Sequence, residues 1–546
     1  MRRLSGIVLL GALAGTVAAA SVPGQPVAAP VLQRVIVQGP SVAAAAVAVR
    51  QAGGTVTHPL AVVDGVAAVL PAGRVLPGMV VTPDAAVSSD EADGSNASTV
   101  KSVYRSETRA DAVGPATGAP VGVAIIDTGI SPVMGLADNL QKVPDPVTKG
   151  KLADCANFSA ETTCDDSYGH GTFLAGLIAG DEGMDPSARL ISIKIAGRSG
   201  SADVSQVLAG IQYAVSFAKD LNIKVLNLSL GTNSNHDYRY DPLNRAVERA
   251  WQAGITVVVA ASNRGPAAQT ISKPGDDPLV LTVGAVDDRE TPSRTDDNVP
   301  AFSGRGPVLE GPTGSLAKPD VVAPGVGLIS YNVAGSYIDQ TAGPSTYPVP
   351  GFRRGSGTSQ STAVVSGAVA LLLERTSFTP DQVKAALMGT AAPVSAAPTA
   401  VGRGLIDVAS AVTANIAGAA QSLPSSGAFD NLDASRGKVL VTGVGCGVLG
   451  DYYRTFVDPK CDYVHGDGTA EGRSFDASAY AGGDWTGSSW YDGQWTGSSW
   501  YGSSWYGSSW YGSSWYGYGS SQDSTEGSVT PLGTVLKGSS WYGVWK

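Results

Sequence analysis

The chain has 546 residues, which is too long for one ordinary domain and suggests two to four domains. Hydrophobic residues make up 43% of it and charged residues only 15%, so it can bury a sizeable core. The net charge of −10 argues against nucleic acid and anionic membranes as partners.

The N-terminus predicts export. Arg2 and Arg3 precede an apolar run over residues 7–20, and the small residues 18–20 resemble a signal-peptidase site. The run is shorter than the roughly 20 residues that cross a bilayer. We therefore predict a cleaved signal peptide over residues 1–20, with an uncleaved membrane anchor as the alternative. The expected location is secreted or cell-surface associated.

Residues 33–88 predict a small unit of strands and one helix. We expect a strand, a helix ended by Gly53-Gly54, and two strands joined at the turn sequence Asp64-Gly65. Their ranges are 34–38, 41–52, 55–63 and 66–70. A linker rich in Ser, Asp and Ala follows, from about residue 88 to residue 99.

From about residue 103 to residue 417 the pattern changes to α/β. Short apolar runs, at 121–126, 190–194, 225–229 and 255–260, alternate with helical segments. Buried parallel strands with crossover helices produce this alternation. In such sheets, active sites gather outside the carboxyl ends of the strands.

Three motifs in this region carry residue types suited to acyl transfer. A predicted strand ends in Asp127-Thr-Gly, and Gly-His170-Gly-Thr precedes an apolar helical run. The third motif, Gly-Ser-Gly-Thr-Ser359, leads into another helical run. A serine hydroxyl needs an adjacent base, normally a histidine, and that histidine needs a carboxylate to hold its tautomer. The order Asp, His, Ser is the subtilisin order.

On these motifs, residues 103–417 resemble the subtilisin family. The resemblance implies a three-layer α/β fold with a mostly parallel sheet, and serine endopeptidase activity on polypeptide substrates. It implies a triad of Asp127, His170 and Ser359, with an amide donated to the oxyanion by Asn263 in the segment 257–263. The Gly-Thr-Ser-Gln segment at Ser359 and the Ser-Ser-Trp tail resemble those of exported subtilases of actinobacterial type.

The resemblance also implies the strands that would hold a substrate backbone by main-chain hydrogen bonds. They are Ser229, Leu230 and Gly231 on one side of the cleft, and Gly200 and Ser201 on the other. The sequence departs from the family at two positions. Ser361 replaces an alanine after the nucleophile, and Ser262 replaces the glycine before Asn263. Neither change removes a group that takes part in the chemistry.

The unit at residues 33–88 resembles the family's propeptide, a small α+β ferredoxin-like domain. The resemblance implies an intramolecular inhibitor that is removed by a cut between Val87 and Val103. An ordinary accessory domain is the alternative. Residue preference at the cleavage site is left open, because Ser272 and Lys273, near the expected pocket floor, align only approximately. A hydrophobic or broad preference is the default.

The four cysteines form two sequence-local pairs, Cys155 with Cys164 and Cys446 with Cys461. An exported chain would bridge them, and local pairing is the simplest of three connectivities. Neither pair has zinc-ligand spacing, and we predict no cofactor. Some subtilases bind calcium through clustered carboxylates, so structural calcium stays open, although no segment here has a calcium signature that would locate it. The acidic pair Asp165-Asp166 is more typical of a solvated loop.

The C-terminal part has a different composition. Residues 430–475 are expected to form a small module, and residues 483–546 form a tail in which Gly-Ser-Ser-Trp-Tyr recurs. The five-residue spacing of its tryptophans matches neither the strand nor the helix period. Attachment to cell-wall glycan through many weak stacking contacts is one hypothesis, and a low-complexity extension without a partner is the other.

Two alternative functions fit the sequence less well. A catalytically silent surface adhesin would use the tail on a subtilisin scaffold, but it would have no chemical reason to keep the triad and Asn263. An esterase on another α/β fold would need a different motif order and a Gly-x-Ser-x-Gly elbow at Ser359, which the sequence lacks.

Overall fold

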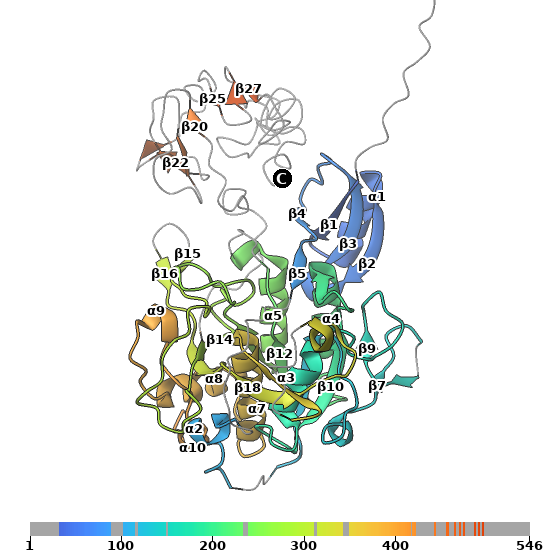
Figure 1. Ribbon diagram of the computed structural model, residues 1–546. Helices are drawn as coiled ribbons and strands as arrows, with labels where there is room; N and C mark the ends of the chain where they lie inside the picture. Colours follow the sequence, from blue (N-terminus) through green and yellow to red (C-terminus); the bar gives the residue numbers. More distant parts are fainter. Residues whose placement is uncertain are drawn as a thin grey trace, which may run out of the picture.

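The computed structural model describes residues 32–88, 102–114, 118–148, 151–232, 238–310, 314–341, 349–416 and 418–421 (Figure 1). It also describes short paired segments between residues 442 and 495. The predictions for residues 1–20, for a bridge between Cys446 and Cys461, and for most of the module and tail lie outside the described residues. Within the described part of the chain, no helix has the length and apolar character to cross a bilayer.

The N-terminal unit is an antiparallel sheet covered on one face by a helix. Ser41 caps this helix, because its hydroxyl accepts a hydrogen bond from the Ala44 amide. The helix packs Ala45 and Val49 against the sheet. The strands lie in the order β2-β3-β1-β4. The elements are β1 (Leu32–Gln38), α1 (Val42–Gln51), β2 (Thr55–Leu60), the 3₁₀ turn η1 (Ala61–Val63), β3 (Gly65–Pro71) and β4 (Val80–Pro83).

This unit differs from the sequence prediction at its second strand. The predicted strand 55–63 ends at Leu60, and η1 replaces its last residues. Val62 and Val63 are buried, and the Val62 amide donates to the Gln212 side chain of the larger domain. Contact with that domain therefore overrides the strand pattern. A ferredoxin-like unit has a second helix before its last strand, whereas residues 72–79 contain none.

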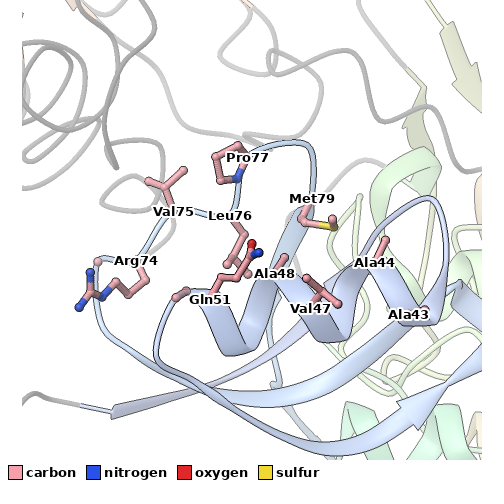
Figure 2. Close-up of a pocket in the computed structure, with 12 residues that line it drawn as sticks. Ala43, Ala44, Val47, Ala48, Gln51, Arg74, Val75, Leu76, Pro77 and Met79 are labelled. Carbon is pink, nitrogen blue, oxygen red and sulfur yellow. The ribbon is translucent and has the colours of Figure 1, made fainter.

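A groove of about 810 Å³ lies on α1. Figure 2 shows it between the helix and the connection that carries Leu76 and Met79. Ala44, Val47 and Ala48 form its helical wall. The groove shares no residue with the candidate active site described below.

The larger domain is built on a seven-stranded sheet in the order β17-β14-β13-β12-β6-β10-β9. All neighbouring strands in it are parallel. The predicted apolar runs are confirmed as strands of this sheet. Its strands are β6 (Gly122–Asp127), β9 (Ala156–Asn157), β10 (Arg189–Lys194), β12 (Ile223–Leu228), β13 (Thr256–Ala260), β14 (Leu281–Val286) and β17 (Val321–Pro324).

Helices cover both faces of the sheet, which gives three layers (Figure 1). Val123 and Ile125 of β6 face α3 (His170–Ala179) and α7 (Thr358–Leu373). The alternate residues Ala124 and Ile126 face α4 (Val204–Ser216) and α5 (Pro242–Gln252). Both faces of β6 are buried, as its uninterrupted apolar sequence predicts.

The remaining elements lie around this core. The helices and 3₁₀ turns are α2 (Tyr104–Glu107), η2 (Ala137–Asn139), η3 (Tyr238–Tyr240), α6 (Tyr337–Thr341), α8 (Pro380–Thr390), α9 (Pro398–Val401) and α10 (Val408–Val412). The strands are β5 (Ala86–Ser88), β7 (Val143–Pro144), β8 (Leu152–Ala153), β11 (Ser201–Asp203), β15 (Val308–Glu310), β16 (Gly314–Leu316), β18 (Leu328–Tyr331) and β19 (Phe352–Gly355). Beyond Gln421 the strands are β20 (Thr442–Gly443), β21 (Thr455–Val457), β22 (Tyr463–His465), β23 (Thr469–Ala470), β24 (Arg473–Ser474), β25 (Trp485–Thr486), β26 (Trp490–Tyr491) and β27 (Gln494–Trp495).

The N-terminal unit docks on α4 and α5 through buried and charged contacts (Figure 1). Asp84 accepts hydrogen bonds from the amide and hydroxyl of Ser205, at 2.8 and 2.7 Å, and so caps the start of α4. Asp64 forms ion pairs with Arg245 and Arg249 of α5, at 2.7 and 2.9 Å. The interface is therefore polar as well as apolar.

Candidate active site

The three candidate catalytic residues stand at the ends of regular elements near one edge of the sheet. Asp127 is the last residue of β6, His170 is the first of α3, and Ser359 is the second of α7. All three are buried. Residues more than 200 positions apart in sequence are thus brought to the carboxyl ends of the strands, as expected for a parallel sheet.

Asp127 and His170 contact each other directly. The Nδ1 atom of His170 lies 2.9 and 3.0 Å from the two carboxylate oxygens of Asp127. Such a carboxylate holds the imidazole with its proton on Nδ1, which leaves Nε2 to act as a base. The geometry therefore fits the pairing that the motif order predicts.

Two glycines allow this close approach. Gly169 has φ of +106°, and a Cβ atom there would meet the Ser336 hydroxyl at 2.7 Å. A Cβ atom on Gly171 would lie 2.2 Å from the carbonyl oxygen of Gly129. A larger residue at Gly171 would push the start of α3 away from the end of β6, and one at Gly169 would have a strained backbone and clash with Ser336.

Asp166 is part of the site, and the prediction of a solvated loop for Asp165-Asp166 is wrong for this residue. Asp166 is buried, and it accepts hydrogen bonds from the amides of Gly169 and Thr172, both at 2.7 Å. It also accepts a 2.7 Å bond from the hydroxyl of Thr128, which in turn lies 3.1 Å from Asp127. Burial raises the pKa of Asp166, although these hydrogen bonds oppose the rise. The residue anchors the first turn of α3.

A buried lysine braces the same region. Nζ of Lys194 donates to the backbone carbonyls of Thr128 and Asp165, at 2.5 and 2.8 Å. It also lies 3.1 Å from the Glu161 carboxylate. From the sequence, Lys194 could be placed only at the end of a strand. In the structure, Lys194 holds together the backbone segments that follow Asp127 and precede His170.

Ser359 lies against the expected substrate-binding segment. Its hydroxyl lies 3.3 Å from the carbonyl oxygen of Ser229, and the Ser229 hydroxyl donates to the Ser359 carbonyl at 3.1 Å. Ser229 follows the end of β12. The structure therefore joins α7 to the segment 229–231 by reciprocal hydrogen bonds.

Asn263 lies beside the start of α7. Its Oδ1 atom accepts hydrogen bonds from the amide and hydroxyl of Thr358, at 2.8 and 2.9 Å. Because Oδ1 faces Thr358, the amide nitrogen of Asn263 is directed away from that residue. This orientation is the one that a donor to an oxyanion beside Ser359 requires.

Ser262 and Ser361, the two departures from the family, fit by different means. Ser262 has φ of +104°, a conformation that suits the usual glycine. Its hydroxyl donates to the Thr270 carbonyl at 2.5 Å. The Ser361 hydroxyl packs where a Cβ atom on Gly325 would meet it at 2.2 Å. Both side chains are buried.

The other expected edge of the cleft is already paired. β11 forms an antiparallel ladder with β5, with Ser201 opposite Ser88 and Ala202 opposite Val87. Gly200, just before β11, has φ of +68°. Val87 shares a small pocket with Asp127, Thr128, Ile195, Ala196, Gly200, Ala202 and Leu230. The pocket is small, with a cavity volume of about 10 Å³, and Val87 forms part of its wall.

The segment near the expected pocket floor is rigidly held. Thr232 and Lys273 exchange backbone hydrogen bonds of 3.1 and 3.0 Å. Nζ of Lys273 lies 2.5 Å from the Asp276 carboxylate. The Ser272 hydroxyl packs against Gly231, where a Cβ atom would meet it at 2.3 Å. The positive charge of Lys273 is therefore balanced by the carboxylate of Asp276.

The predicted bridge between Cys155 and Cys164 is confirmed, with an S–S distance of 2.09 Å. It closes a short loop that runs directly into Asp165 and Asp166. No group of three His, Cys, Asp or Glu side chains among the described residues is arranged to hold a metal ion.

The parallel α/β sheet and the Asp–His pair at its edge define the class, that of α/β serine peptidases. The model described as the subtilase family, Peptidase S8, matches residues 118–421. The chain belongs to the subtilase family, whose members are serine-type endopeptidases. This confirms the family and the fold inferred from the sequence.

Individual relatives also point to the subtilase family. The chain is 39% identical over 285 residues to the serine protease AprX of Bacillus subtilis (strain 168), which covers 49% of this chain and 60% of AprX. It is 33% identical over 304 residues to subtilisin DY of Bacillus licheniformis, covering 54% of this chain and 91% of that protein. The crystal structure of fervidolysin from Fervidobacterium pennivorans, a keratinolytic enzyme related to subtilisin, has a similar fold. The TM-score is 0.55 at 21% identity, over 71% of this chain and 62% of fervidolysin.

Proposed function

We propose that the protein is an exported serine endopeptidase in which Asp127, His170 and Ser359 form the triad. The observation that carries this is the contact of His170 Nδ1 with both carboxylate oxygens of Asp127, at 2.9 and 3.0 Å, at the edge where Ser359 begins α7. A polypeptide is the substrate, as for the family.

The chemistry follows from the arrangement. His170 takes the proton from the Ser359 hydroxyl as its oxygen attacks the substrate carbonyl carbon, and Asp127 stabilises the imidazolium that forms. The amide of Ser359 and the side-chain amide of Asn263 donate to the oxyanion. His170 then gives the proton to the leaving amine, the peptide C–N bond breaks, and water hydrolyses the acyl-enzyme at Ser359.

We also propose that residues 33–88 act as an intramolecular inhibitor. The pairing of β5 with β11 supports this, because β11 is an edge on which the resemblance predicts substrate binding. Val87 lies in the wall of a small pocket together with Asp127 and Leu230. A substrate strand and β5 would therefore compete for the same main-chain groups. The cut that frees the cleft lies beyond β5, between residues 88 and 103. Attachment to cell-wall glycan remains a hypothesis about the tail.

The test compares the full-length protein with Ser359→Ala by mass spectrometry, with casein present. We expect the unmutated protein to lose its N-terminal region and cut casein, and the variant to do neither. Casein cleavage by Ser359→Ala would disprove the triad. If the unmutated protein stays whole and inert, treatment with a trypsin-like protease separates the cases. Casein cleavage after that treatment supports an enzyme activated by another protease, and continued inactivity supports a silent scaffold.

A further inference from the structure

Three carboxyl groups meet in the interior, and none of them belongs to the candidate triad. Glu107 of α2 is 0% exposed, and its carboxyl group contacts those of Asp288 and Asp297. Asp288 is also buried. Both carboxyl oxygens of Glu107 and both of Asp297 are buried without a hydrogen-bond donor. Ionised carboxylates only accept hydrogen bonds, so three ionised groups could not satisfy one another.

The guanidinium group of Arg294 lies near the cluster, but its hydrogen bonds go to other groups. Arg294 directs Nε and Nη2 to the backbone carbonyl of Glu107, at 2.7 and 2.5 Å, and Nη1 to Asp407, at 3.1 Å. The other charged groups that face the cluster, Asp287 and Asp296, are acidic. Arg294 also attracts Asp297, but one cation cannot balance a buried charge of −3, which would cost several kcal/mol per ion.

The side chains of this cluster are not arranged so that a metal ion could balance their negative charges. Within the described ranges, no three His, Cys, Asp or Glu side chains are arranged around a metal position. Direct contact between carboxyl groups is instead the arrangement that a shared proton produces, since a protonated carboxyl group is a donor as well as an acceptor.

We propose that Glu107 is protonated at neutral pH, donates its proton to Asp297 and lies against Asp288, so that a carboxylic acid joins α2 to the loop between β14 and β15. This bridge holds the segment that follows the proposed maturation cut. The same segment is held by the Arg294 contacts and by an ion pair of Arg109 with Asp407 at 2.9 Å.

The electrostatics agree with a retained proton. Burial, followed by contact with Asp297, raises the pKa of Glu107 from 4.5 to about 10. Burial also raises the pKa of Asp288 to about 6 and that of Asp297 above its usual range. Between pH 4.5 and 10 the unfolded chain has released the Glu107 proton while the folded chain keeps it. Stability therefore falls as pH rises through this window, by up to about tenfold in the unfolding constant per pH unit.

The test uses the full chain carrying Ser359→Ala, to prevent self-cleavage, and adds Glu107→Gln. A glutamine amide supplies the donor without a titratable proton. We expect the unfolding constant measured in urea to rise with pH between 5 and 9 in the parent, by up to about tenfold per pH unit. In the variant this contribution of Glu107 should be absent, so the slope should be smaller. The infrared difference spectrum at pH 7, parent minus Glu107→Gln, should show a positive carboxylic acid band. Asp111→Asn, which removes an exposed carboxyl from the same segment, is the control and should leave both readouts unchanged.

Asp297→Asn is the second variant, for use if Glu107→Gln does not fold, and it should also reduce the pH slope. Equal slopes in parent and variants, with no difference in the carboxylic acid band, would overturn the proposal. Calcium chloride offers a separate check. If it stabilises the parent but not Glu107→Gln, the cluster is a cation site and the shared proton is wrong.

Discussion

Thr128 donates its hydroxyl proton to Asp166 across 2.7 Å, and this bond links the end of β6 to the start of α3. One end of the link adjoins Asp127, and the other fixes the amides next to His170. The relative position of the carboxylate and the imidazole is therefore set by a buried network, in addition to their own contact.

Asp166→Asn should lower kcat by up to about 100-fold with a small change in KM, because the amide cannot accept at both ends and His170 would shift. Steady-state kinetics on a peptide substrate would measure this. Asp165→Asn, on the exposed neighbour, is the matched control. A loss confined to KM would show that Asp166 acts on substrate binding and not on the position of His170.

Asn263→Ala should lower kcat by about 100-fold to 1,000-fold, because it removes one donor to the oxyanion. Asn263→Asp has a similar size but no amide donor, so it should lose a comparable amount. The measurement is kcat and KM for each variant. Full activity in Asn263→Asp would exclude the proposed role.

Ser262→Gly should be more stable than Ser262→Ala by about 1–2 kcal/mol, because alanine would keep the positive φ without the hydroxyl that bonds to Thr270. Urea unfolding in the inactive Ser359→Ala background would compare the two. Equal stabilities would mean that the segment relaxes to another backbone conformation.

Arg34→Gln should speed activation of the full-length protein by roughly 2-fold to 5-fold. Arg34 joins Asp84 of the N-terminal unit to Asp203 of β11, at 2.9 and 2.5 Å, so its loss leaves two carboxylates facing each other. The appearance of peptidase activity with time is the readout. Arg50→Gln, at the end of α1, is the control, and an effect of equal size there would point to a general weakening of the unit.

Replacing both Cys155 and Cys164 with alanine should lower stability by about 2–3 kcal/mol, because the bridge restricts the unfolded chain. Unfolding in urea, with and without reductant, would measure the loss. Reductant should destabilise the parent and leave the double variant unchanged. A response of the double variant to reductant would locate the sensitive bond elsewhere.

The sequence predicted the fold and the candidate triad because these depend on local patterns. A buried parallel strand is apolar throughout, so β6 and the position of Asp127 at its end could be located directly. The glycines around His170 and Ser359 likewise marked the starts of two buried helices.

The supporting residues depend on contacts between distant segments, and no local pattern reports them. Asp166 was assigned to a solvated loop because acidic pairs usually are exposed, yet tertiary packing buries it under Thr128. The contact of Glu107 with Asp297 joins two segments that most strands of the large sheet separate in the sequence. The end of β2 at Leu60 was missed because the following valines pack on the other domain.

On the proposed function, the edge of β11 that β5 occupies also limits which proteins can be digested. On the proposed function, a target must present several residues in a row as a free extended strand, since β11 offers backbone groups to the incoming chain. Compact targets satisfy that demand only where a segment opens locally. Their digestion should therefore follow the population of those openings, so that unfolded polypeptides are consumed first and tightly folded ones last.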